Sequence, residues 1–157
     1  MSINDTIFAL SSGKGRSGIA IIRLSGHAAG TALQSLTNKE LPSPRLVKRT
    51  TFVNSQGDIL DDGLALWFPA PASFTGEDVV ELHIHGGIAV INAVLQSLST
   101  LPTLRPAEPG EFSRRSFENG KMDLTAAEGL ADLIEAETEA QRKQARRQSR
   151  GELGRLY

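Results

Sequence analysis

Short apolar runs separated by polar, glycine-rich segments mark the first part of the chain. Residues 6–10 form one apolar run and residues 19–25 form a β-branched one, with a glycine-rich stretch between them. This pattern predicts strand, loop, strand. Ser25 carries a hydroxyl that could cap a helix running to about Ser35. The proline-containing segment 41–44 is expected to end that helix.

Two further β-rich runs, 45–54 and 59–68, surround a short segment that contains a glycine. They predict an antiparallel hairpin with its turn at 55–58. The sheet is therefore not expected to be purely parallel.

The next stretch predicts a loop, a strand and a helix in that order. Residues 69–78 are rich in proline and small polar residues, and residues 79–87 alternate between apolar and polar. Within residues 86–100 the apolar positions 88, 91, 94, 95 and 98 recur at helical spacing. Residues 101–121 predict a further loop with one short helix after Pro109.

From Asp123 onward the pattern changes to a long, alanine-rich helix with apolar residues three and four positions apart. Its first half is acidic and its second half basic, an order that suits the helix dipole. This pattern favours the interpretation that the helix is solvated and docks on further helices over the interpretation that its basic half binds tRNA. We expect the stop at residues 151–157 to be a cut within a domain rather than the end of one.

These elements together predict an α+β fold: a mixed, partly antiparallel sheet with packed helices, followed by a long C-terminal helix. Composition agrees with a globular domain, since 39% of the residues are hydrophobic and 22% are charged. The formal net charge of -1 provides no overall basic field for nucleic acid.

Composition also removes several kinds of chemistry. The 157 residues include no cysteine, which excludes disulfides, a thiolate nucleophile and a cysteine-based zinc site in this chain. The first ten residues carry an acid where a signal peptide has its basic region, and no apolar run reaches membrane-spanning length. A cytoplasmic protein is the default expectation.

Residues 13–18 read GKGRSG and match the dinucleotide-binding spelling G-x-G-x-x-G. That motif works when its last glycine opens a helix whose N-terminus meets the pyrophosphate. Here Gly18 opens a predicted strand, and the Gly-Lys pair stands at the front of the loop rather than at its end. The context therefore favours a hairpin loop over a nucleotide site.

Polar residues alternate with apolar ones along 79–87, so that Glu81, His83 and His85 share one face of a strand. Three interpretations stay open on the residues alone: a metal site, a structural polar face, and a carboxylate that reads a ligand. Arg23 poses a similar question, because a charge in an apolar strand needs a partner. An internal ion pair with a nearby acid would satisfy it.

The chain resembles a known family, the bacterial and organellar tRNA-modification GTPases called MnmE or TrmE, because several long motifs occur in the same order as in that family. The motifs are DTIFAL with GRSGIAIIRLSG, DDGLALWFPAPASFTGEDVVELHIHGG, and RPAEPGEFSRRSFENGKMDLTAAEGLADLI. The resemblance runs along essentially the whole chain and is far more specific than a lone G-x-G-x-x-G.

The resemblance implies a protein of three parts: a tetrahydrofolate-binding domain of a fold related to aminomethyltransferases, a helical domain, and a potassium-dependent, magnesium-using GTPase domain. Residues 1–120 would be the folate-binding and dimerisation domain, and residues 121–157 the first helix of a truncated helical domain. With a flavin-dependent partner, the family installs a carboxymethylaminomethyl-type group on the tRNA wobble uridine, position 34. The chain has no G-x-x-x-x-G-K-[ST] motif, so we expect no GTP hydrolysis from it alone.

The family's folate-contacting positions correspond to Arg23, Glu81 and Lys121, with no catalytic residue and no metal ligand in this chain. The expected cofactor is 5-formyltetrahydrofolate or a related tetrahydrofolate. Expected partners are a second copy of the chain, the flavin-dependent protein and, through the full complex, tRNA, with no membrane.

The same resemblance implies supporting roles around that site. His83, His85 and the turn at 86–87 would hold the ligand-binding residues in place, and the loop 73–78 would fold over them. Two alternatives remain: a scaffold that dimerises and docks the partner without a functional folate site, and an enzyme with aminomethyltransferase-like folate chemistry.

Overall fold

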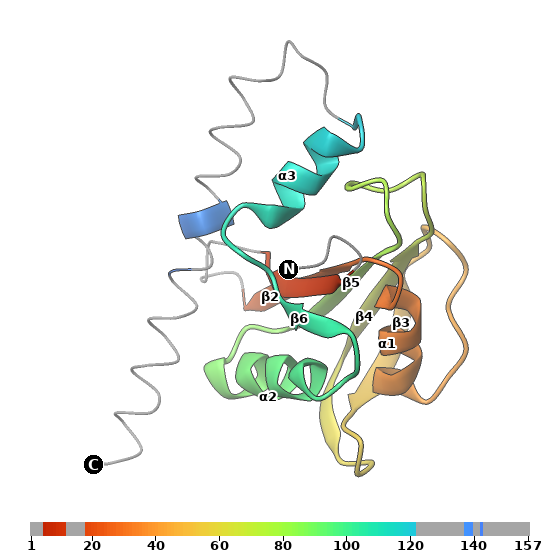
Figure 1. Ribbon diagram of the computed structural model, residues 1–157. Helices are drawn as coiled ribbons and strands as arrows, with labels where there is room; N and C mark the ends of the chain where they lie inside the picture. Colours follow the sequence, from red (N-terminus) through yellow and green to blue (C-terminus); the bar gives the residue numbers. More distant parts are fainter. Residues whose placement is uncertain (1–4, 12–17, 122–136, 140–141, 143–157) are drawn as a thin grey trace.

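The structure is a computed structural model that describes residues 5–11, 18–121, 137–139 and 142. The described residues form one six-stranded sheet and three helices, which confirms the mixed α+β architecture (Figure 1). The strands are β1 Thr6–Leu10, β2 Ile19–Ser25, β3 Lys48–Val53, β4 Ile59–Phe68, β5 Val79–His85 and β6 Leu104–Pro106. The helices are α1 Ala29–Thr37, α2 Ile88–Ser99 and α3 Glu111–Glu118.

The strand order in the sheet is β3-β4-β5-β2-β1-β6. Neighbouring strands are antiparallel except for β1 and β6, which pair in parallel. The predicted β3–β4 hairpin and the β1–β2 pair are therefore confirmed. The sequence did not predict β6, because three residues are too short to show a period.

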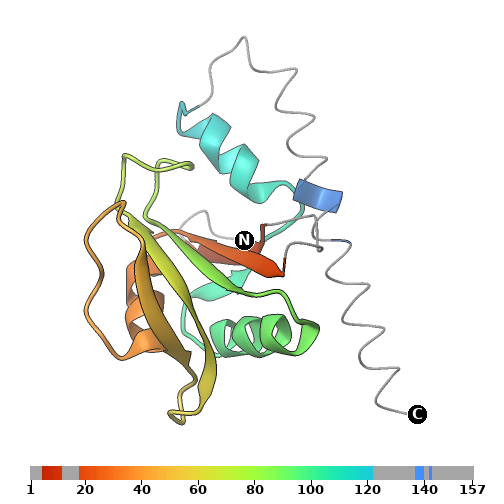
Figure 2. The same ribbon diagram turned by 180° about the vertical axis from the view of Figure 1, so that it is seen from behind.

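Helices α1 and α2 pack on one face of the sheet, and α3 lies on the opposite side in both views (Figures 1 and 2). Alternate residues of β2 and β5 point toward α1 and α2 and are buried, as the sequence pattern predicted. The members from these two strands are Ala20, Ile22, Leu24, Val80, Leu82 and Ile84. The intervening residues, which include Arg23 and Glu81, lie on the other face.

The prediction that Ser25 caps α1 is wrong. Ser25 is the last residue of β2, and its hydroxyl bonds to Thr75 and Glu77 instead. The backbone N–H of Ala28 is satisfied by the hydroxyl of Thr6, which comes from the neighbouring strand. A tertiary contact therefore replaces the local cap.

Gly63 allows β4 to approach β5 closely. A Cβ atom at this position would lie 2.2 Å from the carbonyl oxygen of His83. Any other residue would push the two strands apart at that point.

Two predicted features lie outside the described residues. Most of the GKGRSG loop belongs to 12–17, and the long helix from Asp123 belongs almost wholly to 122–157, of which only 137–139 and 142 are described. Within the described ranges, no helix combines the length and the apolar character needed to cross a membrane.

Candidate ligand-binding site

The candidate site begins with an ion pair between two adjacent strands. Arg23 of β2 stands opposite Glu81 of β5 in the antiparallel register, and both side chains lie on the face away from α1 and α2. Arg23 Nη2 donates to Glu81 Oε2 at 3.2 Å, with about a fifth of each side chain exposed. The structure thus brings two of the three predicted site residues into contact.

Glu81 is held at both oxygens but is not saturated. His83 Nε2 lies 3.1 Å from Oε1, while Oε2 accepts from Arg23. An ionised carboxylate only accepts hydrogen bonds, so this nitrogen of His83 carries a proton. A carboxylate offers about four acceptor positions, so Glu81 is oriented by its neighbours and keeps capacity for a ligand.

Arg23 also keeps donors that no described group uses. Its guanidinium carbon lies 4.9 Å from the centre of the Phe74 ring, a cation–π distance. Its Nε is buried without a hydrogen-bond partner. Buried donors are seldom left unpaired, and a bound ligand is one way to satisfy them. The internal ion pair foreseen for Arg23 is present, and its partner is the carboxylate expected to read the ligand.

Lys121 contacts the loop that lies over this pair. Its Nζ donates to the carbonyl oxygen of Pro71 at 3.0 Å, and among the described residues it forms no hydrogen bond or salt bridge with Arg23 or Glu81. Pro71 and Phe74 belong to the same loop, 69–78, and the Phe74 ring lies over the guanidinium of Arg23. The structure therefore places Lys121 against the same loop whose Phe74 lies over Arg23.

Helix α3 fixes that loop through hydrogen bonds to its backbone. Ser116 donates to the carbonyl oxygen of Phe74 at 2.7 Å, and Asn119 donates to that of Thr75 at 2.8 Å. Gly76 has φ of +84°, and a Cβ atom there would lie 3.0 Å from Cβ of Asn119. This position needs glycine both for its backbone angle and for the close approach of α3.

A network of charged residues, which the sequence analysis missed, joins α3 to the loop and to β6. Arg105 holds both oxygens of Glu111 at 2.8 Å and reaches Asp5 at 3.1 Å. Arg115 lies 3.0 Å from Glu111 and 3.0 Å from Glu77 of the loop. The i,i+4 spacing of Glu111 and Arg115 on the predicted short helix was the available signal.

The network sets the charge state of its members. Burial by itself raises the pKa of Glu111, but hydrogen bonds from Arg105 and from the backbone of Glu108 outweigh it and lower the pKa to about 2. The bond to Glu111 in turn raises the pKa of Arg105 above its usual range. Both partners therefore stay ionised at neutral pH, and the pair is bidentate.

Glu137 adds a second carboxylate near Arg23. Its Oε1 accepts from the backbone N–H of Ser113 at 3.3 Å, and its Oε2 is buried without a partner. Burial raises the pKa of Glu137, while the Ser113 bonds and the charge of Arg23 act against that rise. Sequence reasoning placed this residue on the later helix and assigned it no role.

His85 does not join the candidate site as expected. Its Nδ1 lies 2.8 Å from Asp61 of β4, and the side chain is mostly exposed. His83, in contrast, does support Glu81. Within the part of the chain that the structure describes, no group of three or more His, Cys, Asp or Glu residues could hold a metal ion.

Comparison with known proteins decides the family to which this fold and site belong. Residues 6–121 match the family described as GTP-binding protein TrmE N-terminus. The chain belongs to the TrmE family. The matched range contains Arg23, Glu81, Lys121 and the loop 69–78, whereas Glu137 lies beyond it.

The curated relatives agree. The chain is 60% identical over 154 residues to the tRNA modification GTPase MnmE of Paramagnetospirillum magneticum, covering 98% of this chain and 35% of that protein. It is 61% identical over 153 residues to the human mitochondrial 5-taurinomethyluridine-[tRNA] synthase subunit GTPB3, covering 96% and 31%. This TrmE-family chain spans about a third of the length of these relatives.

Proposed function

We propose that this TrmE-family chain binds a tetrahydrofolate one-carbon derivative, such as 5-formyltetrahydrofolate, through Arg23, Glu81 and Lys121. The observation that supports the proposal best is the Arg23–Glu81 pair, which His83 orients and Phe74 covers. This pair leaves Glu81 with free acceptor positions and Arg23 with a buried, unused N–H, and a ligand could use both.

The chemistry of a pterin suits this arrangement. A pterin presents a ring N–H beside an exocyclic amine, and one carboxylate can accept from both. Glu81 is the acceptor for these two donors. The glutamate tail of folate is anionic, and Arg23 and Lys121 supply the cations for it and for the polar group near N5.

Names of the relatives support a role for the whole protein in tRNA modification. In this proposal the folate site supplies the one-carbon unit for a carboxymethylaminomethyl-type modification of wobble uridine 34, together with a flavin-dependent partner. GTP hydrolysis, with its potassium and magnesium ions, belongs to a domain outside this chain. The protein acts in the cytoplasm.

Homodimerisation is the second element of the proposal. Ile19 and Leu64 are exposed on the sheet face that carries Glu81, and Phe74 is exposed beside it. Exposed apolar residues around a polar centre are typical of an interaction surface. The same observation favours the alternative function, a scaffold that dimerises and docks a partner with no functional folate site.

Calorimetric titration of the 157-residue chain with 5-formyltetrahydrofolate tests the proposal. We expect saturable binding that Glu81→Gln weakens by about tenfold or more, because hydrogen bonds to a charged group contribute about 1.5–3 kcal/mol. Glu118→Gln is the matched control, since Glu118 is an exposed acid on α3. It should bind as the unchanged chain does, and GTP should give no heat of binding.

Two outcomes would overturn the folate site. One is the absence of folate binding by a chain whose circular dichroism and thermal unfolding are normal. The other is equal affinity of the Glu81→Gln and Glu118→Gln variants. If sedimentation still shows a dimer in either case, the scaffold function replaces the folate function.

A further inference from the structure

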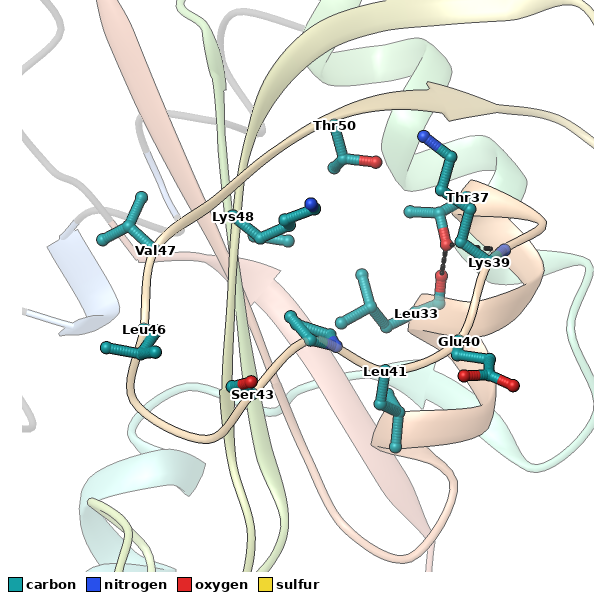
Figure 3. Close-up of a pocket in the computed structure, with 12 residues that line it drawn as sticks. Leu33, Thr37, Lys39, Glu40, Leu41, Ser43, Leu46, Val47, Lys48 and Thr50 are labelled. Carbon is teal, nitrogen blue, oxygen red and sulfur yellow. Dashed lines mark hydrogen bonds between the residues drawn. The ribbon is translucent and has the colours of Figure 1, made fainter.

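A pocket opens between α1 and β3, on the face of the sheet opposite the Arg23–Glu81 pair (Figure 3). Its volume is about 400 Å³, within the range of small-molecule sites. The segment that joins α1 to β3 forms its outer wall, and Leu33 of α1 and Ala65 of β4 form its floor. No residue of the folate proposal lines this pocket.

The alternation of β3 explains why space remains there. Lys48, Thr50 and Phe52 share the face that looks toward α1, and Phe52 is fully buried in the core. Thr50 has a smaller side chain than Phe52 and precedes it by two residues on the same face of β3. The segment between α1 and β3 contains Pro42. In this segment Leu41 packs against the core, but the residues next to it leave the space between α1 and β3 open. The pocket is thus framed by fixed elements.

Thr50 supplies the observation that points to a ligand. The residue is only 7% exposed, and its Oγ1 is buried without a hydrogen-bond partner. Figure 3 shows this hydroxyl directed into the pocket. An unpaired buried hydroxyl destabilises the fold, because it has given up its hydrogen bonds to water without gaining others. A ligand that accepts its hydrogen bond would recover part of that loss.

The charged residues that line the pocket indicate that such a ligand is negatively charged. Lys39 and Lys48 line the pocket together with a single acid, Glu40. Among the described residues, neither lysine has a salt bridge, and Figure 3 shows both ammonium groups at the same end of the pocket as Thr50. Away from these cations, the lining is apolar: Leu33 on the floor, with Leu41 and the exposed Leu46 beside it. The pocket is therefore cationic at one end and apolar away from it.

We propose that this pocket binds a small amphipathic carboxylate, with an aromatic or aliphatic body on the leucines and its anionic group against Lys48, Lys39 and the Thr50 hydroxyl. A carboxylate can take the hydroxyl hydrogen bond and two ammonium contacts at once. A bare inorganic anion would leave the apolar part of the pocket unfilled, so the ligand is expected to carry an apolar group as well. The site is independent of the folate proposal, because it lies across the sheet.

Nuclear magnetic resonance with 4-phenylbutyrate as the probe tests this site. In ¹H–¹⁵N spectra of the 157-residue chain, we expect saturable shifts at Leu33, Leu41 and Ala65, and none at Arg23 or Glu81. The neutral analogue 4-phenylbutanol and inorganic phosphate should each bind about tenfold more weakly. The alcohol lacks the anionic group, and phosphate lacks the apolar body.

Two variants sharpen the test. Lys48→Ala should weaken binding of 4-phenylbutyrate by about tenfold, while Arg49→Ala, the adjacent cation on the other face of β3, should not. Thr50→Val keeps the shape of the side chain and removes the hydroxyl. It should raise the melting temperature of the free chain, because an unpaired buried group is lost, and should weaken binding of the carboxylate.

Three results would overturn the proposal: no saturable shifts at the pocket, equal affinity for the carboxylate and the alcohol, or full affinity in Thr50→Val. The last result is informative even if Lys48→Ala unfolds, since the valine variant is expected to be at least as stable as the unchanged chain.

Discussion

The guanidinium of Arg23 contacts two neighbours that come from different parts of the chain. Glu81 meets it from the adjacent strand, and Phe74 lies over it from the loop. A planar group is needed for both contacts at once, because it donates at its edge and stacks through its face. At the scale of single residues, this geometry makes arginine and lysine unequal at position 23.

Arg23→Lys should therefore weaken binding of 5-formyltetrahydrofolate by about tenfold while the fold persists. An ammonium keeps the charge but loses the stacking on Phe74 and the fork of donors. Calorimetry measures the affinity, and Arg49→Lys on the exposed part of β3 is the matched control. Unchanged affinity in Arg23→Lys would show that charge alone suffices and that the planar contact has no role.

Among the secondary-structure elements, α3 has the greatest influence on the site. It bonds to the loop 69–78 through Ser116 and Asn119, and its acid Glu111 is clamped by Arg105 and Arg115. Arg115 then reaches Glu77 within the loop. The loop over Arg23 is thus positioned by a helix and by charges, since it contains no regular structure of its own.

Glu111→Gln should lower the free energy of unfolding by about 2 kcal/mol at pH 7, because it removes the charged acceptor that Arg105 and Arg115 share and leaves them only Asp5 and Glu77. The folded pKa of Glu111 lies near 2 against its ordinary value of 4.5. Its stabilisation is therefore complete above pH 4.5 and is lost as the pH falls toward about 2. Urea unfolding of both chains at several pH values measures the difference.

The control for this measurement is Glu118→Gln on the exposed side of α3, which should change stability by less than about 0.5 kcal/mol. Comparing variant with unchanged chain removes the opposite contribution of Glu137, whose pKa is raised. A difference between the two chains that stays constant from pH 7 to pH 3 would contradict the role of the ionised Glu111.

In the whole molecule, the two faces of the sheet differ. One face is covered by α1 and α2 (Figures 1 and 2). The face of Arg23 and Glu81 carries the exposed Ile19 and Leu64. Apolar side chains on an otherwise polar face suit association with a second copy of the chain. The proposed dimer would bring two folate sites close to one interface.

Ile19→Asp should therefore shift the chain toward monomer, with at least about a tenfold weaker dimer, because a charge would be buried in the interface. Ile59→Asp is the matched control: Ile59 is 71% exposed at the far end of the β3–β4 hairpin, against 53% for Ile19. Sedimentation velocity across a concentration series measures both. Equal behaviour of the two variants would place the interface elsewhere.

The sequence by itself determined most elements and their faces. The strands β1 to β5, the helices α1 to α3, and the burial of alternate residues in β2 and β5 follow from local periods and turn residues. It also singled out Arg23 and Glu81, because a charge in an apolar strand and a carboxylate on a polar face stand out against their neighbours.

Only the tertiary structure decided how distant residues meet. The register that sets Arg23 against Glu81, the Thr6 hydroxyl that replaces Ser25 at the start of α1, and the pairing of β6 all depend on contacts between segments far apart in the chain. So does the clamp of Arg105 on Glu111. Local periodicity records which face a residue occupies, whereas partners are set by the packing of elements, which no short window of sequence contains.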